Sequence, residues 1–143
     1  MTSHAPYPRS VLVDAGGWLA LSDEDDDHHQ PALAIQRQLT THRPQLYVTD
    51  FLIDETYTLI RYRLNHRLAV RFLDRVYAST ITRVRVTPED EAAAEAILRR
   101  YADKRFSYTD ATGFVIMERL RIEAAFTFDR NFTEYGRITI LRP

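Results

Sequence analysis

The stretch Phe106-Ser-Tyr-Thr-Asp-Ala-Thr-Gly-Phe-Val-Ile-Met117 places a carboxylate at the start of an apolar helix. Ser107 or Thr109 is suited to be the N-cap, and Ser107 and Asp110 have the spacing of a capping box, so Asp110 falls in the first turn. The residues that follow are apolar on nearly every face, which is typical of a helix buried against a sheet. At such a position an ionised carboxylate needs the helix N-terminus, a basic partner or a cation.

Alternating strands and helices surround this helix in the sequence. Short apolar runs predict strands at residues 10–14, 46–48, 80–86, 124–128 and 138–141. Helices are predicted at residues 18–21, 27–39, 50–64, 68–78 and 88–101, the second of them starting at a capping box of Asp27 and Gln30. This alternation predicts an α/β fold with a parallel sheet covered by helices on both faces.

Length and composition indicate one globular domain over residues 1–143. The 143 residues suffice for one core and are too few for two ordinary domains. No apolar run approaches the roughly 20 residues of a membrane span, and the first residues lack the pattern of a signal peptide. We therefore expect a cytoplasmic protein without membrane contact.

The charged and sulfur-containing residues restrict the chemistry further. The chain has no cysteine, which excludes disulfides and thiolate metal ligands, so that any metal must be held by oxygen or histidine. Its formal net charge of -1 gives no overall attraction to nucleic acid. An RNA partner would therefore have to be bound by clustered arginines.

Two of the predicted strands end in aspartate, Asp14 and Asp129. In doubly wound folds the functional crevice lies beyond the carboxyl ends of the strands, so residues there are the first candidates for a site. Either aspartate alone is explained by a turn or a helix cap. The two together favour a functional site.

The helix predicted from residue 50 contributes one further acid. At about 100° per residue, its leucines, isoleucines and Thr56 form one apolar arc, and Asp54 lies opposite that arc. Glu55 lies on the shoulder of the arc and faces the rim of the core. A snorkelling side chain or an arginine partner would also explain Glu55.

Four acids are thus expected at one edge of the sheet: Asp14, Glu55, Asp110 and Asp129. Two carboxylates about 5 Å apart repel by roughly 3 kcal/mol at an effective dielectric constant near 20, and each raises the pKa of the other. A divalent cation removes this cost. Oxygen ligands without cysteine favour Mg²⁺ or Mn²⁺ over Zn²⁺.

Four stretches of the chain resemble the PIN-domain ribonucleases, and specifically the VapC-type toxins of toxin-antitoxin pairs. They occur in the family's order: Val11-Leu-Val-Asp14, Thr49-Asp-Phe-Leu-Ile-Asp-Glu55, Phe106-Ser-Tyr-Thr-Asp110 and Ala125-Phe-Thr-Phe-Asp129-Arg-Asn-Phe132. The resemblance implies a flavodoxin-like parallel sheet of four to five strands on which the four acids bind metal. It also implies an endoribonuclease dependent on Mg²⁺ or Mn²⁺, a cognate antitoxin and a homodimer.

One departure from the family pattern follows the first aspartate. The family often has serine or threonine there, whereas this chain has Ala15-Gly16-Gly17. Either a hydroxyl group that supports the site is missing, or the glycines let a phosphate approach the backbone amides. Thr109 and Thr127 lie next to the acids in sequence and are candidates for supporting hydrogen bonds, although Thr109 could instead cap its helix.

Arginines on two helices are weaker candidates for contact with RNA or a partner protein. Arg67, Arg71 and Arg75 recur every four residues, and Arg61 and Arg63 precede them. A solvated helix face explains this stripe equally well. The acidic run at residues 23–27 followed by two histidines is interpreted as a solvated loop rather than a metal site, because nothing fixes the ligand geometry.

Two rival functions remain open. A catalytically inactive PIN-fold module that binds protein or RNA would keep the fold, but it would have no physical reason to keep four acids. Phosphate-accepting receiver domains and aspartate-nucleophile phosphatases are disfavoured. Receiver domains require a lysine at a strand end, and none of the predicted strands ends in lysine. Such phosphatases require another aspartate two residues after Asp14, where this chain has glycine.

Overall fold

A parallel sheet forms the centre of the molecule. The computed structural model describes residues 5–78 and 80–143. Within these residues the strands are β1 (Ser10–Val13), β2 (Gln45–Thr49), β3 (Thr82–Val84), β4 (Ala124–Phe126) and β5 (Thr139–Ile140). All neighbouring strands are parallel, in the order β3-β2-β1-β4-β5. The predicted α/β fold with a parallel sheet is confirmed.

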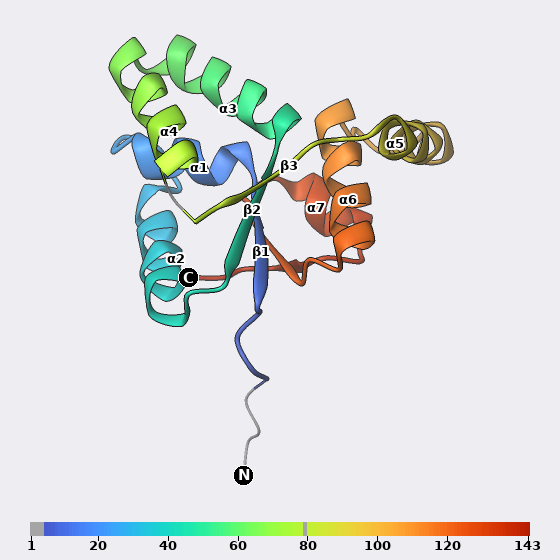
Figure 1. The fold of residues 1–143 in the computed structure, drawn as a ribbon, viewed down its shortest axis with the longest axis horizontal. Helices are drawn as coiled ribbons and strands as arrows, with labels where there is room; N and C mark the ends of the chain where they lie inside the picture. The colour runs from blue at the N-terminus through green and yellow to red at the C-terminus, as the bar shows by residue number, and fades with distance from the viewer. Residues whose placement is uncertain (1–4, 79) are drawn as a thin grey trace.

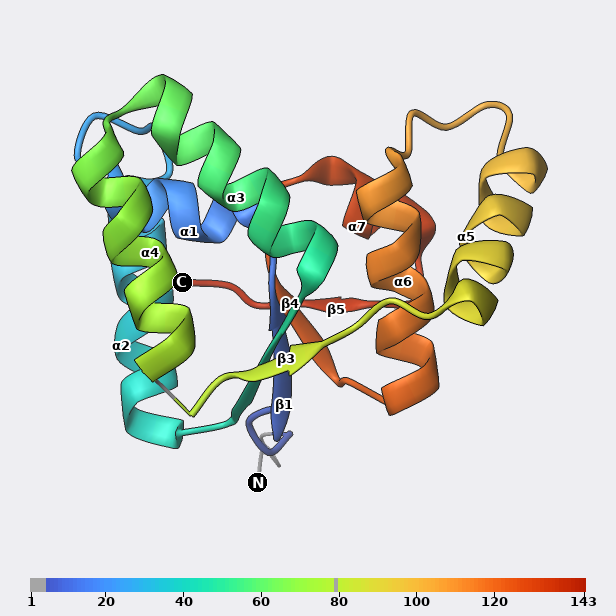
Figure 2. The ribbon, with the colours of Figure 1, turned by 45° about the horizontal axis from the view of Figure 1, so that its top comes forward.

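Helices cover both faces of the sheet, as predicted (Figures 1 and 2). On one side lie α1 (Ala15–Ser22), α2 (His29–His42), α3 (Asp50–Arg63) and α4 (His66–Ala78). On the other lie α5 (Pro88–Arg100), α6 (Tyr108–Leu120) and α7 (Arg130–Tyr135). None of the helices in the described part of the chain is long and apolar enough to cross a membrane.

Helix α6 is buried as its sequence predicts. Every residue from Asp110 to Met117 is buried. Phe114 stacks on Tyr135 with ring centroids 4.2 Å apart and meets Phe132 edge-on at 5.0 Å. This aromatic packing fixes α6 against α7, so that the acid in its first turn is held on a rigid element.

The structure differs from the sequence-based prediction at the start of two helices. Helix α1 begins directly after Asp14, three residues earlier than predicted. A Cβ atom on Gly17 would lie 3.0 Å from the Phe126 side chain and 3.1 Å from its carbonyl oxygen, so glycine is what lets α1 pack this closely on β4. The capping box of Asp27 and Gln30 was wrong, because α2 begins at His29 and its N-cap, His28, makes no side-chain cap.

Histidine packing explains the start of α2. The His28 ring stacks on Phe128 at a centroid distance of 4.4 Å, and His29 Nδ1 lies 2.7 Å from the Ala20 carbonyl oxygen. Tertiary contacts rather than a local cap therefore position this helix. One imidazole is thus stacked on an aromatic ring and the other is within hydrogen-bond distance of a backbone carbonyl.

Candidate active site

The sheet order brings the first and the last acid together. β1 lies between β2 and β4, which is the point where the direction of strand addition reverses. Asp14 directly follows β1, and its backbone N–H donates to the Phe126 carbonyl at 3.0 Å. Asp129 lies three residues beyond β4. Both therefore lie at the carboxyl edge, at the position where open α/β sheets bind ligands.

Asp14 is buried, and it forms no ion pair among residues 5–78 and 80–143. Its side chain is 5% exposed, and Oδ2 accepts a hydrogen bond from Thr127 Oγ1 at 2.8 Å. The pKa of Asp14 is raised to about 7; burial is the largest cause, the charges of Asp110 and Glu55 also raise the pKa, and the Thr127 hydrogen bond lowers it. Thr127, a predicted supporting residue, thus supplies a hydroxyl group to the first aspartate.

Asp110 forms the predicted capping box with Ser107. Ser107 Oγ accepts from the Asp110 N–H at 2.9 Å, and Asp110 Oδ2 accepts from the Ser107 N–H at 2.9 Å. Asn131 Nδ2 also donates to Oδ2, at 2.8 Å. Within residues 5–78 and 80–143, every hydrogen bond to this carboxylate goes to Oδ2, which leaves Oδ1 for a ligand. Burial is the main cause that raises the pKa of Asp110.

A second capping box in the molecule shows what a purely structural aspartate looks like. Asp90 occupies the same position in α5, with Thr87 as N-cap, and is 3% exposed. Arg119 donates to both of its oxygens, at 2.8 and 2.9 Å. Although burial opposes it, this bidentate pair lowers the pKa of Asp90. Asp110 has a neutral amide where Asp90 has a guanidinium.

Glu55 lies close enough to the other acids to be repelled by them. It is half-buried on α3, whereas Asp54 is exposed, as helical periodicity predicted. Partial burial, followed by the charges of Asp110, Asp129 and Asp54, raises the pKa of Glu55. The helix face therefore directs Glu55, and not its neighbour, toward the buried acids.

Asp129 is the N-cap of α7. Its Oδ1 accepts from the Asn131 N–H at 2.9 Å, and its own N–H donates to Thr127 Oγ1 at 3.0 Å. Thr127 and Asn131 thus each link two acids. Thr109 forms no such link, because its hydroxyl makes no hydrogen bond within the described residues and Ser107 caps the helix. The sequence did not single out Asn131. Its position was nevertheless a signal, because an aspartate that caps a helix is expected to accept a hydrogen bond from the backbone N–H two residues later.

The donor set fits a hard divalent cation. No ion pair to any of the four acids occurs within the described parts of the chain. Nor do three or more carboxylates or imidazoles there lie in a ready-made metal cage, as expected for carboxylates that repel one another. An oxygen-rich set with a buried member and unused oxygens matches Mg²⁺ or Mn²⁺.

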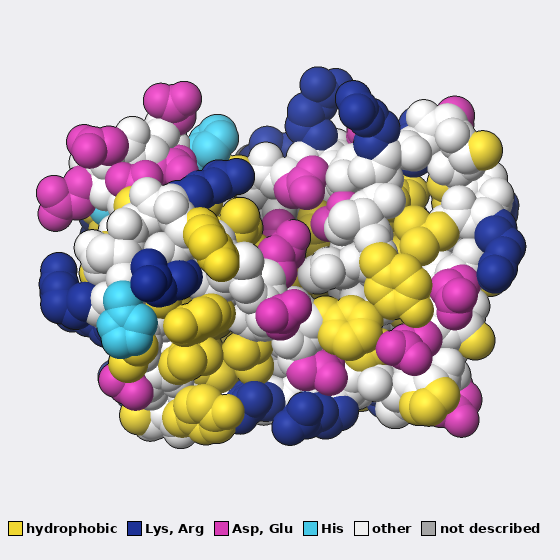
Figure 3. All heavy atoms as spheres, turned by 90° about the horizontal axis from the view of Figure 1, so that it is seen from above, with side chains coloured by type: hydrophobic (Ala, Val, Ile, Leu, Met, Phe, Trp, Pro, Cys, Tyr) yellow, Lys and Arg dark blue, Asp and Glu magenta, His cyan; other side chains and the backbone are white. Residues whose placement is uncertain are grey.

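The view onto the carboxyl edge shows how charges are distributed around this site (Figure 3). Acidic side chains form a row through the middle, and basic side chains lie at both ends of it. Asp129 and Asn131 of the site line a pocket of mixed charge, together with three basic residues (Lys104, Arg105 and Arg130) and two further acids (Asp103 and Glu134). The edge thus combines an acidic centre with basic ends.

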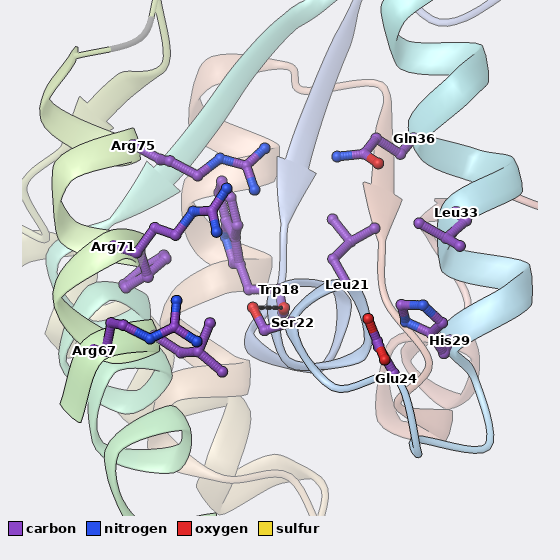
Figure 4. Close-up of a pocket in the computed structure, with 12 residues that line it drawn as sticks. Trp18, Leu21, Ser22, Glu24, His29, Leu33, Gln36, Arg67, Arg71 and Arg75 are labelled. Atoms are coloured by element: carbon purple, nitrogen blue, oxygen red, sulfur yellow. Dashed lines mark hydrogen bonds between the residues drawn. The ribbon is translucent and has the colours of Figure 1, made fainter. Parts of the chain in front are cut away.

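The arginine stripe lies elsewhere. Arg67, Arg71 and Arg75 extend from α4 into a pocket of about 670 Å³ that α1 and α2 also line, with Trp18 and Leu33 among its walls (Figure 4). None of the three forms an ion pair in the part of the chain that the structure describes, and the Arg75 guanidinium lies 5.8 Å from the Trp18 ring centroid.

Two arginines predicted with this stripe do not line its pocket. Arg61 and Arg63 are exposed in the last turn of α3. Of the five arginines that the sequence grouped together, three therefore line this pocket.

Comparison with known proteins places the chain in a family. The family model of the PIN domain matches residues 11–138. The chain belongs to the PIN-domain family. Among its relatives is the 23S rRNA-specific endonuclease VapC20 of Mycobacterium tuberculosis, 31% identical over 131 residues that cover 91% of this chain and 97% of the relative. A VapC ribonuclease of Archaeoglobus fulgidus is 29% identical over 87% of this chain and 80% of that protein.

A solved structure agrees with this PIN-domain assignment. The crystal structure of M. tuberculosis VapC20, described as a sarcin–ricin loop cleaving toxin, superposes with a TM-score of 0.83 at 30% identity. The match covers 94% of this chain and all of that one. The predicted resemblance to VapC-type PIN domains is confirmed, and its relatives are named as ribonucleases.

Proposed function

We propose that this PIN domain is an Mg²⁺- or Mn²⁺-dependent endoribonuclease that hydrolyses RNA phosphodiester bonds, the toxin of a toxin-antitoxin pair. The observation that carries the proposal is the assembly of Asp14, Glu55, Asp110 and Asp129 at the topological switch point without a basic partner among the described residues. A bound divalent cation would lower the pKa of a water molecule and stabilise negative charge on the leaving oxygen.

The side chains around the acids hold them in place for this chemistry. Thr127 fixes one oxygen of Asp14, and Asn131 fixes one oxygen of Asp110. Asp110 Oδ1 accepts no hydrogen bond among the described residues and would be available to a cation, and an acid of the set can accept a proton from the attacking water. Partial burial and the neighbouring acids raise the pKa of Glu55, which favours proton acceptance by this residue relative to an ordinary exposed glutamate.

A catalytically inactive PIN-fold module is the alternative function. It is disfavoured by the contrast between Asp90 and Asp110. Where the fold needs only a capping carboxylate, an arginine neutralises it, as at Asp90. A module without catalytic activity would gain stability from the same arrangement at Asp110, since an unpaired buried acid is costly.

RNA and a cognate antitoxin are the proposed partners. The pocket beside α4 combines apolar walls with three arginines, which suits a peptide that carries both apolar and acidic side chains. We therefore assign the antitoxin, rather than RNA phosphates, to this pocket. Homodimer formation stays a prediction, which light scattering of the purified chain tests.

Cleavage of a broad RNA pool tests the proposed activity. The purified chain, freed of antitoxin by refolding, is expected to cleave RNA in Mn²⁺ and to lose cleavage in excess EDTA. Asp14→Asn and Asp110→Asn are each expected to lower the rate at least about 100-fold, because each removes a charge from the cation-binding set. Equal cleavage, or equal absence of cleavage, by the parent and both variants would contradict the proposal.

A further inference from the structure

Two aromatic side chains connect the helices that carry Glu55 and Asp110. Phe51 lies in the first turn of α3 and Tyr108 is the first residue of α6, and their ring centroids are 6.0 Å apart with a 40° tilt. Phe51 precedes Glu55 by one helical turn, and Tyr108 precedes Asp110 by two residues. The aromatic pair therefore lies on the same two helices as two of the four acids, within about one helical turn of each in sequence.

Tyr108 is exposed without a structural reason for its exposure. Its side chain is 40% exposed, and within the described residues its hydroxyl group makes no hydrogen bond. Two other tyrosines are more exposed. The ring of one of them, Tyr77, has a cation–π partner, because the central guanidinium carbon of Arg83 lies 4.3 Å from its centroid. In the view onto the carboxyl edge, apolar side chains lie directly beside the acidic row (Figure 3).

The charges around Tyr108 decide which part of an RNA could contact it. The carboxylates of Glu95 and Glu91 on α5 act electrostatically on its hydroxyl group, and Asp110 follows two residues later on the same helix. A phosphate at this position would be repelled by these carboxylates. A nucleobase is uncharged and has an apolar face, and stacking on an aromatic ring is a usual way for proteins to bind unpaired bases.

We propose that Phe51 and Tyr108 form a stacking site for an unpaired base of the RNA, next to the scissile phosphate. The inference rests on the proposed function, since it requires an RNA substrate at the four acids. It assigns to the pair a positioning role: the stacked base holds the neighbouring phosphate at the acidic row. The charge pattern favours a base here over a phosphate or an acidic peptide.

Binding of a fluorescent random-sequence single-stranded RNA pool tests this proposal. The measurement uses the Asp14→Asn background with Mg²⁺, so that RNA is not cleaved. Tyr108→Ala is expected to raise the Kd by between about 5-fold and 100-fold, the range for loss of one stacked base. Tyr108→Phe keeps the ring and should bind like the parent, whereas Tyr108→Leu keeps apolar volume alone and should bind like Tyr108→Ala.

Salt dependence separates base stacking from a phosphate contact. The slope of log Kd against log salt should be unchanged in Tyr108→Ala, because a lost phosphate contact would change it by about 0.7. Tyr77→Ala, an exposed tyrosine in the last turn of α4, is the matched control and should bind like the parent.

The outcomes distinguish this inference from the proposed function. Parent-like binding by Tyr108→Ala or Tyr108→Leu, or a changed salt slope, would overturn the stacking site while leaving the nuclease proposal intact. The stacking site would also be overturned if Tyr108→Ala weakened only the complex with the antitoxin, because Phe51 and Tyr108 would then contact a protein instead of RNA. Absence of RNA cleavage by the parent protein in Mn²⁺ would overturn both.

Discussion

Asp14, Asp90 and Asp110 are buried to a similar degree, and their partners determine what each can do. Their side chains are 5%, 3% and 6% exposed. Arg119 neutralises Asp90, whereas a hydroxyl and an amide, both uncharged, bind the other two. Uncharged donors orient a carboxylate and leave its charge for a cation.

The unpaired state of Asp14 predicts how stability depends on pH when metal is absent. The Asp14 carboxyl of the unfolded chain loses its proton near the ordinary pKa of 3.8, whereas in the folded protein its pKa is about 7. The free energy of unfolding should therefore fall as pH rises through this interval, because the folded state binds more protons.

Urea unfolding in EDTA measures this effect. Between pH 5 and pH 8 the parent should lose about 3 kcal/mol more than Asp14→Asn, whose amide does not titrate. Added Mn²⁺ should restore stability to the parent at pH 8. Parallel pH profiles for the two proteins would show that Asp14 is not the buried titrating acid.

Helix α4 has one face in the core and one face that lines the arginine pocket. One of its faces packs Phe72 and Val76 into the core, while Arg67, Arg71 and Arg75 line the pocket. Four-residue spacing predicted the stripe, but its neighbours across the pocket come from α1 and α2. The sequence therefore left open whether the arginines are merely solvated.

Charge reversal in this pocket tests its assignment to the antitoxin. Arg71→Glu should weaken the complex with the cognate antitoxin by about 10-fold or more, because it places a negative charge where acidic side chains are expected. RNA cleavage by the free variant should match the parent. Calorimetric titration measures the affinity for the antitoxin, and a cleavage assay measures the nuclease activity. Arg61→Glu, which lies outside the pocket, is the control. A loss of cleavage with unchanged antitoxin affinity would assign the pocket to RNA instead.

The elements were predictable wherever local pattern determines them. Apolar periodicity located the strands and α6, and capping chemistry offered Ser107 or Thr109 as the N-cap of α6, of which Ser107 is the cap. Helix α7 was missed because its six residues are too few for a periodic signal, although a helix cap was one of the explanations open for Asp129. The start of α2 was misplaced because the His28 stack on Phe128, 100 positions away, overrides the local signal.

At the scale of the whole molecule, the candidate site depends on long-range packing. Thr127 and Asp14 are separated by 113 positions and meet only because β4 pairs with β1. The four acids could be predicted from strand ends, a helix face and a family resemblance. Asn131 could not, because its contact with Asp110 depends on how α7 docks against α6.

The same arrangement explains why the site tolerates glycines after its first aspartate. Gly17 lets α1 approach Phe126, so its role is in packing. The hydroxyl group on Asp14 comes from Thr127 across the sheet. The sequence left open whether a supporting hydroxyl group is missing or the glycines let a phosphate approach the backbone. Because packing on Phe126 accounts for Gly17 and Thr127 supplies a hydroxyl group, phosphate binding is not needed to explain the glycine at residue 17.

The central claim is that four acids from distant parts of the chain form one cation site, and calorimetric titration of the purified protein with Mn²⁺ tests it most directly. Asp14→Asn, Glu55→Gln, Asp110→Asn and Asp129→Asn should each weaken Mn²⁺ binding by about 10-fold or more. Asp54→Asn, the exposed neighbour of Glu55, should bind like the parent. Mn²⁺ affinity unchanged in all four variants, or lowered equally in Asp54→Asn, would contradict the claim.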